Sequence, residues 1–327
     1  MRNSTIDCTR LVAAFFVIAL HVGTYSDVSY TFGELARIAG RWAVPFFFVV
    51  TGYFIGLQEK ESKCHLQAFR ILKIFLISSI MYLPYCFMKN PDYLESLTLT
   101  RFVISGTYFH LWFLSSLAIG LLAFQFLHKT LPKSLLVVSF ILITAYVITD
   151  LAAYLETENA FTALHGKIRH TMSLAFIIIG YKMSRLNIDK TPLNGLMASS
   201  LFILFLVYFT EPLLLDFLIG SNAMARQFPA FTALVTIAIM FLCLKGKMEK
   251  SVFSEAGKNY SLGIYLVHPL FMPIFSKIFT YFPSLPQTIP VLISTFLFSW
   301  LFVSILMRRV PFLYRLLYGD FKLSRRA

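Results

Sequence analysis

The sequence predicts an all-α protein, a polytopic bundle of about ten transmembrane helices in a single domain over residues 1–327. Of the 327 residues, 57% are apolar and only 14% are charged, whereas a soluble globular domain has about 25% charged residues. Apolar runs such as "LFILFLVYF" and "SLAFIIIGY" recur along the whole chain. These runs are apolar on every face and do not alternate, which argues against a transmembrane β-barrel.

Ten segments are candidates for membrane-spanning helices, each of which needs about 20 mostly apolar residues. We predict them near 9–26, 41–57, 70–88, 108–127, 134–152, 168–183, 195–211, 225–244, 260–279 and 288–307. A charge precedes the first segment but no small-residue cleavage site follows it, so we interpret it as a span and not as a signal peptide. Because the intervening loops are short, we expect the chemistry inside the bundle or at its two mouths.

The basic residues predict the orientation of the bundle. With both termini in the cytoplasm, the inner segments hold 21 of the 29 Lys and Arg residues and the outer segments hold eight. The acidic residues divide into seven inside and nine outside. An inner excess of Lys and Arg is typical of membrane proteins, so we predict N-in and C-in. This explains most of the net charge of +13 without a nucleic-acid partner.

Several common kinds of site lack support in the sequence. The four cysteines show neither CxxC pairing nor metal-ligand spacing, so we expect free thiols and no metal. The chain contains no HExxH, Walker loop, Rossmann glycine pattern or GxSxG elbow. Metalloprotease, ATPase and ordinary serine-hydrolase functions are therefore not favoured.

The first span carries two side chains that are costly inside a membrane, Arg10 and His21. They are eleven residues apart, which places them on one helix face about 16 Å apart along the axis. Asp7 lies three residues before Arg10 and is in position to pair with it. Arg10 alone would also suit an interfacial anchor. The His21 side chain is too short to extend to the membrane interface in this way. A neutral imidazole in a polar cavity can act as a general base.

Three further polar residues belong to the predicted outer mouth. Arg41 opens the second span in "RWAVPFFFVVTGYF", and His110 and Trp112 open the fourth in "YFHLWFLSSL". Trp112 alone would also suit the aromatic belt at a membrane interface.

The ninth span and one inner loop supply the remaining candidates. In "YSLGIYLVHPL", Tyr265 and His268 are three residues apart and share a face at about mid-depth. His268 precedes a proline, so a role in a helix kink is an alternative. Arg70 and Lys73 in "KCHLQAFRILK" lie at the cytoplasmic mouth, where they would also satisfy the positive-inside rule.

Four ordered blocks between residues 6 and 268 resemble the membrane acyltransferase-3 family, especially its small bacterial members. The family opens with I-D-x-x-R, ten residues and His, as in "IDCTRLVAAFFVIALH". Its R-x-x-V-P-x-F-F-x-x-S-G pattern resembles "RWAVPFFFVVTG", with Thr51 where Ser is usual. The later blocks resemble "HLWFL" at 110–114 and "SLGIYLVH" at 261–268. Each block is weak by itself, but their order is specific.

The resemblance implies an O-acyltransferase of the bacterial inner membrane. Family members move an acyl group, usually acetyl from cytoplasmic acetyl-CoA, to hydroxyls of surface glycans or lipid-linked glycans. The donor would then be bound by Asp7, Arg10, Arg70 and Lys73. The acceptor would be bound by Arg41, His110 and Trp112. His21 would act as general base or acyl relay, with Tyr265 or His268 orienting the imidazole or stabilising the oxyanion.

One motif departs from the family, and two other functions remain open. Some members carry R-x-x-R where this chain has "QAFR", so Gln67 replaces the first arginine. Lys63 or Lys73 is a candidate replacement, although a lysine does not reproduce the guanidinium fork. The main alternative is a transporter of an anionic solute or a lipid-linked sugar. A polymerase or ligase of lipid-linked sugars is the second alternative.

Overall fold

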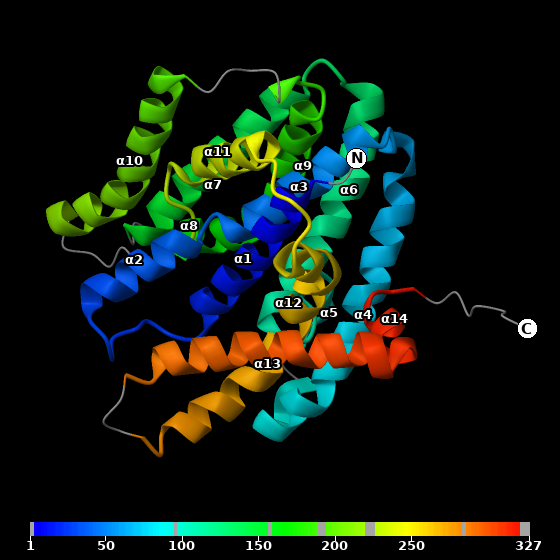
Figure 1. Cartoon of the computed structure of the whole chain (residues 1–327), viewed down its shortest axis with the longest axis vertical. Helices are drawn as coiled ribbons and strands as arrows, with labels where there is room; N and C mark the ends of the chain where they lie inside the picture. Colours follow the sequence, from blue (N-terminus) through cyan, green and yellow to red (C-terminus); the bar gives the residue numbers. More distant parts are fainter. Residues whose placement is uncertain are drawn as a thin grey trace, which may run out of the picture.

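The computed structural model shows an all-α bundle (Figure 1). It describes residues 3–94, 97–155, 159–188, 194–219, 226–282 and 286–320. Within these ranges the regular structure is helical and contains no β-strand. The predicted fold class, an all-α polytopic membrane bundle, is confirmed.

The α-helices follow the apolar segments of the sequence. Their bounds are α1 Ser4–His21, α2 Tyr30–Gly40, α3 Ala43–Leu57, α4 Cys64–Lys89, α5 Leu99–Ser105, α6 Trp112–Thr130, α7 Leu135–Tyr154, α8 Asn159–Ile168, α9 Met172–Met183, α10 Gly195–Ile219, α11 Thr232–Lys245, α12 Val252–Phe279, α13 Thr288–Arg309 and α14 Pro311–Leu317. Short 3-10 helices are η1 Glu61–Lys63, η2 Pro91–Leu94, η3 Phe109–Leu111 and η4 Arg169–Thr171.

Eight helical stretches in the described residues are long and apolar enough to cross a bilayer. Two predicted spans are realised by shorter helices, since α9 has 12 residues and α11 has 14. At 1.5 Å per residue, these helices fall short of a hydrocarbon core of about 30 Å. All but two of the α9 residues are buried. Inside a protein a short helix is tolerated at membrane depth, because its ends meet protein and not lipid.

Helix α1 lies at the centre of the bundle and packs against α12 and α3 (Figure 1). Eight of its 18 residues are buried, and Asn3 caps its first turn by accepting from the backbone N–H groups of Thr5 and Ile6. Helix α10 lies at the edge of the bundle, where it contacts α2 and α11. Its large apolar side chains, such as Phe217 at 84% exposure, face outward. This exposure is expected of a surface that meets lipid.

Glycines allow the central helices to pack backbone to backbone. A Cβ added at Gly180 of α9 would overlap the Val49 carbonyl oxygen of α3, and one at Gly52 would overlap that of Ile177. Between α1 and α12, a Cβ at Gly257 would overlap the Asp7 carbonyl oxygen. Small residues at such crossings are typical of membrane helices. The α3–α9 and α1–α12 contacts therefore depend on these glycines.

We expect Gly180→Ala to destabilise the folded protein by about 1–3 kcal/mol, because the added methyl group meets rigid backbone. Unfolding of the detergent-solubilised protein, followed by heating or denaturant, would measure this change. Gly166→Ala in α8 is the matched control, since a Cβ there meets nothing within 4 Å. Equal stability of the two variants would contradict the proposed packing role of Gly180.

Candidate active site

Two cavities lie at opposite ends of α1. The cavity at the N-terminal end is lined by Arg10 and has a volume of about 660 Å³. The cavity at the C-terminal end is lined by His21 and has a volume of about 510 Å³. According to the predicted orientation these are the inner and outer cavities, and these names are kept below. The helix spacing thus places the two polar side chains of the first span in different chambers.

The inner cavity is basic. Its cationic lining residues are Arg10, Lys60, Lys63, Arg70 and Lys258. Within the part of the chain that the structure describes, none of the residues that line it is Asp or Glu. Gln67, the residue that departs from the family motif, also lines this cavity. Such a lining suits a ligand that carries several negative charges.

The outer cavity has a mixed aromatic and basic lining. Its polar and aromatic residues include His21, Arg37, Arg41, Tyr93, Arg101, Tyr108, Trp112, Tyr146, Arg169, Gln227 and Tyr265. Its described lining residues also include no Asp or Glu. Trp112 stacks with Arg169, whose guanidinium carbon lies 4.5 Å from the centre of the ring.

Phe113 and Tyr265 line both cavities. Their rings pack edge to face with centroids 5.1 Å apart. The Tyr265 hydroxyl donates a hydrogen bond to the backbone carbonyl of His110. The two rings therefore form part of the wall that separates the inner from the outer cavity.

His21 is the last residue of α1 and presents its imidazole to the outer cavity. Its ring stacks parallel to that of His268 at 5.6 Å and packs edge-on against Phe109 at 4.8 Å. The structure shows no hydrogen bond between its ring nitrogens and another described residue. Because the ring is held by aromatic contacts alone, its nitrogens remain available to a ligand.

His268 lies behind His21 and has no exposed surface. Its Nδ1 is 2.8 Å from the backbone carbonyl of Tyr265, so this nitrogen must carry the proton and Nε2 is the acceptor of the neutral ring. It does not line either cavity. Because the two imidazole rings are stacked in parallel, the N–H of His268 does not point at the ring nitrogens of His21. Its geometry suits a positioning residue for His21.

His110 is also fully buried and does not line either cavity. Its ring lies 5.6 Å from that of His268, and its carbonyl accepts from Tyr265. Among the residues that the structure describes, no three His, Cys, Asp or Glu side chains are grouped so that they could hold a metal ion.

The predicted donor residues are brought only partly together. Asp7 and Arg10 form an ion pair at 3.4 Å, and Arg10 lines the inner cavity. Arg70 lines it too, and its Nε donates to the Tyr318 carbonyl at 3.0 Å. Lys73 is exposed and lines neither cavity. Lys63, named above as a replacement for the missing arginine, does line the inner cavity.

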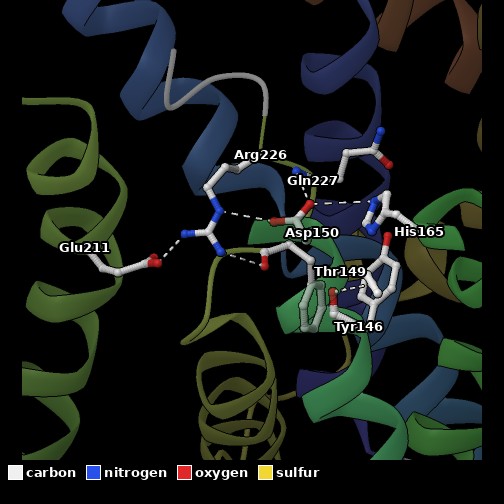
Figure 2. A network of polar contacts seen from close by, with 8 residues as sticks. Tyr146, Thr149, Asp150, His165, Glu211, Arg226 and Gln227 are labelled. Atoms are coloured by element: carbon white, nitrogen blue, oxygen red, sulfur yellow. Dashed lines mark hydrogen bonds and ion pairs between the residues drawn. The ribbon is translucent and has the colours of Figure 1, made fainter. Parts of the chain in front are cut away.

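A buried ionic network shapes one side of the outer cavity (Figure 2). Arg226 donates from Nε to Asp150 of α7 at 3.1 Å and pairs with Glu211 of α10 through a second nitrogen. The other Asp150 oxygen accepts the backbone N–H of Gln227 at 3.0 Å. His165 of α8 lies 3.7 Å from Asp150, and burial lowers the pKa of its imidazole. The network thus ties three helices to the segment that carries Gln227.

The sequence analysis did not identify this network or three of the arginines that line the outer cavity. Asp150 and Glu211 interrupt otherwise apolar helices, a signal that by itself indicates buried ion pairing or function. Arg37, Arg101 and Arg169 lie in segments interpreted as outer loops or their borders. Their convergence could not be read from spacing, because they come from α2, α5 and η4.

With the geometry established, comparison with known proteins identifies the family. Residues 3–304 match the acyltransferase domain of the acyltransferase-3 family. The chain belongs to this family. The match spans α1 to α13 and includes all the residues that line the two cavities except Tyr318. The predicted resemblance is therefore confirmed, and the chain is a multi-pass membrane protein.

Curated proteins similar to this chain are longer than it. An amino-acid racemase of Enterococcus faecalis is 24% identical over 88% of this chain and 43% of its own length. A serine/alanine racemase of Enterococcus gallinarum is 26% identical over 41% of this chain and 21% of its own length. The chain thus spans less than half the length of these relatives. No solved structure matches it.

We expect Arg226→Met to destabilise the protein by roughly 3–5 kcal/mol, because it leaves the buried Asp150 carboxylate without its cation. Unfolding in detergent would measure the change. Arg185→Met is the control, since Arg185 forms a surface ion pair with Glu61 at 2.6 Å and is itself 45% exposed. Loss of such a pair costs ~1 kcal/mol or less. Similar losses in both variants would refute the structural role of the network.

Proposed function

We propose that this protein is a membrane O-acyltransferase that transfers acetyl from cytoplasmic acetyl-CoA to a hydroxyl of a surface glycan or lipid-linked glycan. The observation that supports this proposal most directly is the pair of cavities that share Phe113 and Tyr265 in their linings. His21 faces the outer of the two. Donor and acceptor can then approach one centre from opposite sides of the membrane. The family membership supports the acyl-transfer chemistry. We place the protein in the inner membrane of a bacterium.

The inner cavity is the proposed donor site. Coenzyme A carries phosphates and an adenine ring, and the described lining supplies five Lys and Arg residues and no carboxylate. Lys63, Arg70 and Lys258 would bind phosphates at the mouth, and Arg10 lies deeper along α1. The pantetheine arm would then extend toward Tyr265 and Phe113 and bring the thioester to the wall of the outer cavity.

His21 is the proposed proton acceptor. The acceptor hydroxyl attacks the thioester carbonyl, a C–O bond forms and the C–S bond breaks. His21 takes the hydroxyl proton and passes it to the leaving thiolate, which yields an O-acetyl ester and free coenzyme A. In the second route, His21 itself takes the acetyl group and then releases it to the hydroxyl. Both routes require an imidazole that is open to the outer cavity.

The other two residues predicted to be catalytic would support His21. The Tyr265 hydroxyl is already a donor to the His110 carbonyl, so oxyanion stabilisation by this hydroxyl would require that bond to break. We therefore propose that Tyr265 shapes the wall between the cavities. His268 would hold the His21 ring in place through their parallel stack.

The racemase activity in the relatives' names is not part of this proposal. The chain spans less than half the length of those proteins. The transporter alternative makes a different prediction about product, because transport moves a solute without forming a covalent bond. Proteoliposomes that hold a glycan and receive labelled acetyl-CoA would separate the two, since only the acyltransferase gives a labelled glycan.

We expect His21→Ala to lower acetyl transfer in proteoliposomes by about a hundredfold or more, because a general base contributes roughly 10²–10⁴-fold. Binding of coenzyme A should stay near normal, since His21 does not line the inner cavity. His65→Ala is the control, because His65 bonds to Gln125 and lines neither cavity. Near-normal transfer by a folded His21→Ala protein would exclude both routes.

We expect Lys63→Gln to weaken coenzyme A binding about twofold to fivefold, because an exposed ion pair is worth ~1 kcal/mol or less. Lys73→Gln removes the same charge from a neighbouring position that does not line the cavity, and it should leave binding unchanged. Titration calorimetry of the two variants in detergent at low and high salt would measure this. A larger effect at Lys73 would place the donor site elsewhere.

A further inference from the structure

Four arginines converge on the outer cavity. Arg37 comes from α2, Arg41 follows that helix, Arg101 comes from α5, and Arg169 comes from η4. Among the described residues that line this cavity, none is Asp or Glu. A cavity of about 510 Å³ is of a size that encloses a small ligand or one sugar unit. The described part of the lining thus gathers four cationic side chains where the proposed acceptor would bind.

This concentration is unusual for the predicted outer side of the membrane. That side holds only eight of the 29 Lys and Arg residues, and four of the eight line this one cavity. All four are arginines, although lysine would serve equally well for solubility. Arginine presents a planar fork that matches the oxygens of a carboxylate or phosphate. The choice of residue therefore points to an oxyanion ligand.

Contacts within the protein hold two of the four guanidinium groups in place, those of Arg37 and Arg169. Arg37 donates to the carbonyls of Leu20 and Gly23 at 3.4 and 3.2 Å. Arg169 stacks on Trp112. The Asp150 carboxylate, which lies outside the lining, is engaged by Arg226 and by the N–H of Gln227. The positive charge of the cavity is thus positioned in advance for a ligand.

We propose that the acceptor is acidic: it carries a carboxylate or phosphate that the arginine cluster binds while its hydroxyl meets His21. This inference rests on the proposed function, since it names the substrate class of the same site. The cluster consists of Arg37, Arg41, Arg101 and Arg169. The phosphates of the donor do not explain the cluster, because the inner cavity at the other end of α1 has its own five basic residues.

The test uses the purified full chain in proteoliposomes with acetyl-CoA and two matched pairs of acceptors. Methyl glucuronide is compared with methyl glucoside, and glycerol 3-phosphate with glycerol. We expect the acidic member of at least one pair to be acetylated with a kcat/KM roughly tenfold or more above that of its neutral partner. The pair that shows the preference distinguishes a carboxylate from a phosphate. Equal acetylation within both pairs would overturn the inference and leave the proposed function standing.

Substitutions in the arginine cluster test whether these side chains cause the preference for acidic acceptors. We expect Arg101→Gln and Arg169→Gln to lower kcat/KM for the preferred acidic acceptor about tenfold to a hundredfold, mainly through KM. The loss for the neutral partner should be severalfold smaller, because it carries no anion for these arginines to bind. Lys277→Gln removes an exposed cation from the same predicted side, outside the cavity lining, and should change neither. Equal losses for acidic and neutral acceptors in the arginine variants would contradict anion recognition.

Binding without the donor decides the inference even if no transfer is seen. Methyl glucuronide or glycerol 3-phosphate should raise the melting temperature of the protein in detergent, and the neutral partners should not. That shift should disappear in Arg101→Gln and persist in Lys277→Gln. Acid-selective binding without transfer to any acceptor would refute the proposed function but support the anion site. Absence of acid-selective binding and transfer would refute the anion site.

Discussion

The packing of α1 against α12 determines where the chemistry of this protein can take place. Gly257 lets the α12 backbone lie directly against the Asp7 carbonyl of α1. This contact fixes the two helices at one end, and the stacked rings of His21 and His268 connect them at the other. Since α1 is straight and central, its length sets the distance between the Arg10 and His21 chambers. The remaining helices surround this pair.

The cavity walls depend on residues that perform no chemistry. Asp150, Glu211 and Arg226 bury three charges together, an arrangement that is stable only when the charges are paired. Through the backbone of Gln227 the network fixes one side of the outer cavity. Elsewhere in the wall, Tyr108 stacks on the ring of Tyr82, whose hydroxyl donates to the Leu266 carbonyl of α12 at 2.7 Å. Side chains far apart in sequence thus hold the chamber open.

The proposed reaction also depends on a thin partition. Phe113 and Tyr265 face both chambers, so a thioester and a hydroxyl can meet there without a continuous water path across the bilayer. The two chambers are both basic, but they have different linings. The inner one combines lysines and arginines with glutamines, and the outer one combines arginines with aromatic rings. This difference suits a flexible, polyanionic donor below and a compact acceptor above.

The sequence by itself determined the helical class, the places of eight of the ten predicted spans, the family and the face shared by Arg10 and His21. These follow from local hydrophobicity, helix periodicity and short ordered motifs. Only the tertiary structure decided that Lys73 lies outside the inner cavity while Lys63 lines it, and that His110 and His268 lie behind the cavity surface. It also brought together Arg37, Arg41, Arg101 and Arg169, which come from three separate segments of the chain. Convergence of this kind depends on how helices cross, and helix crossing is set by packing between distant residues, which local pattern does not encode.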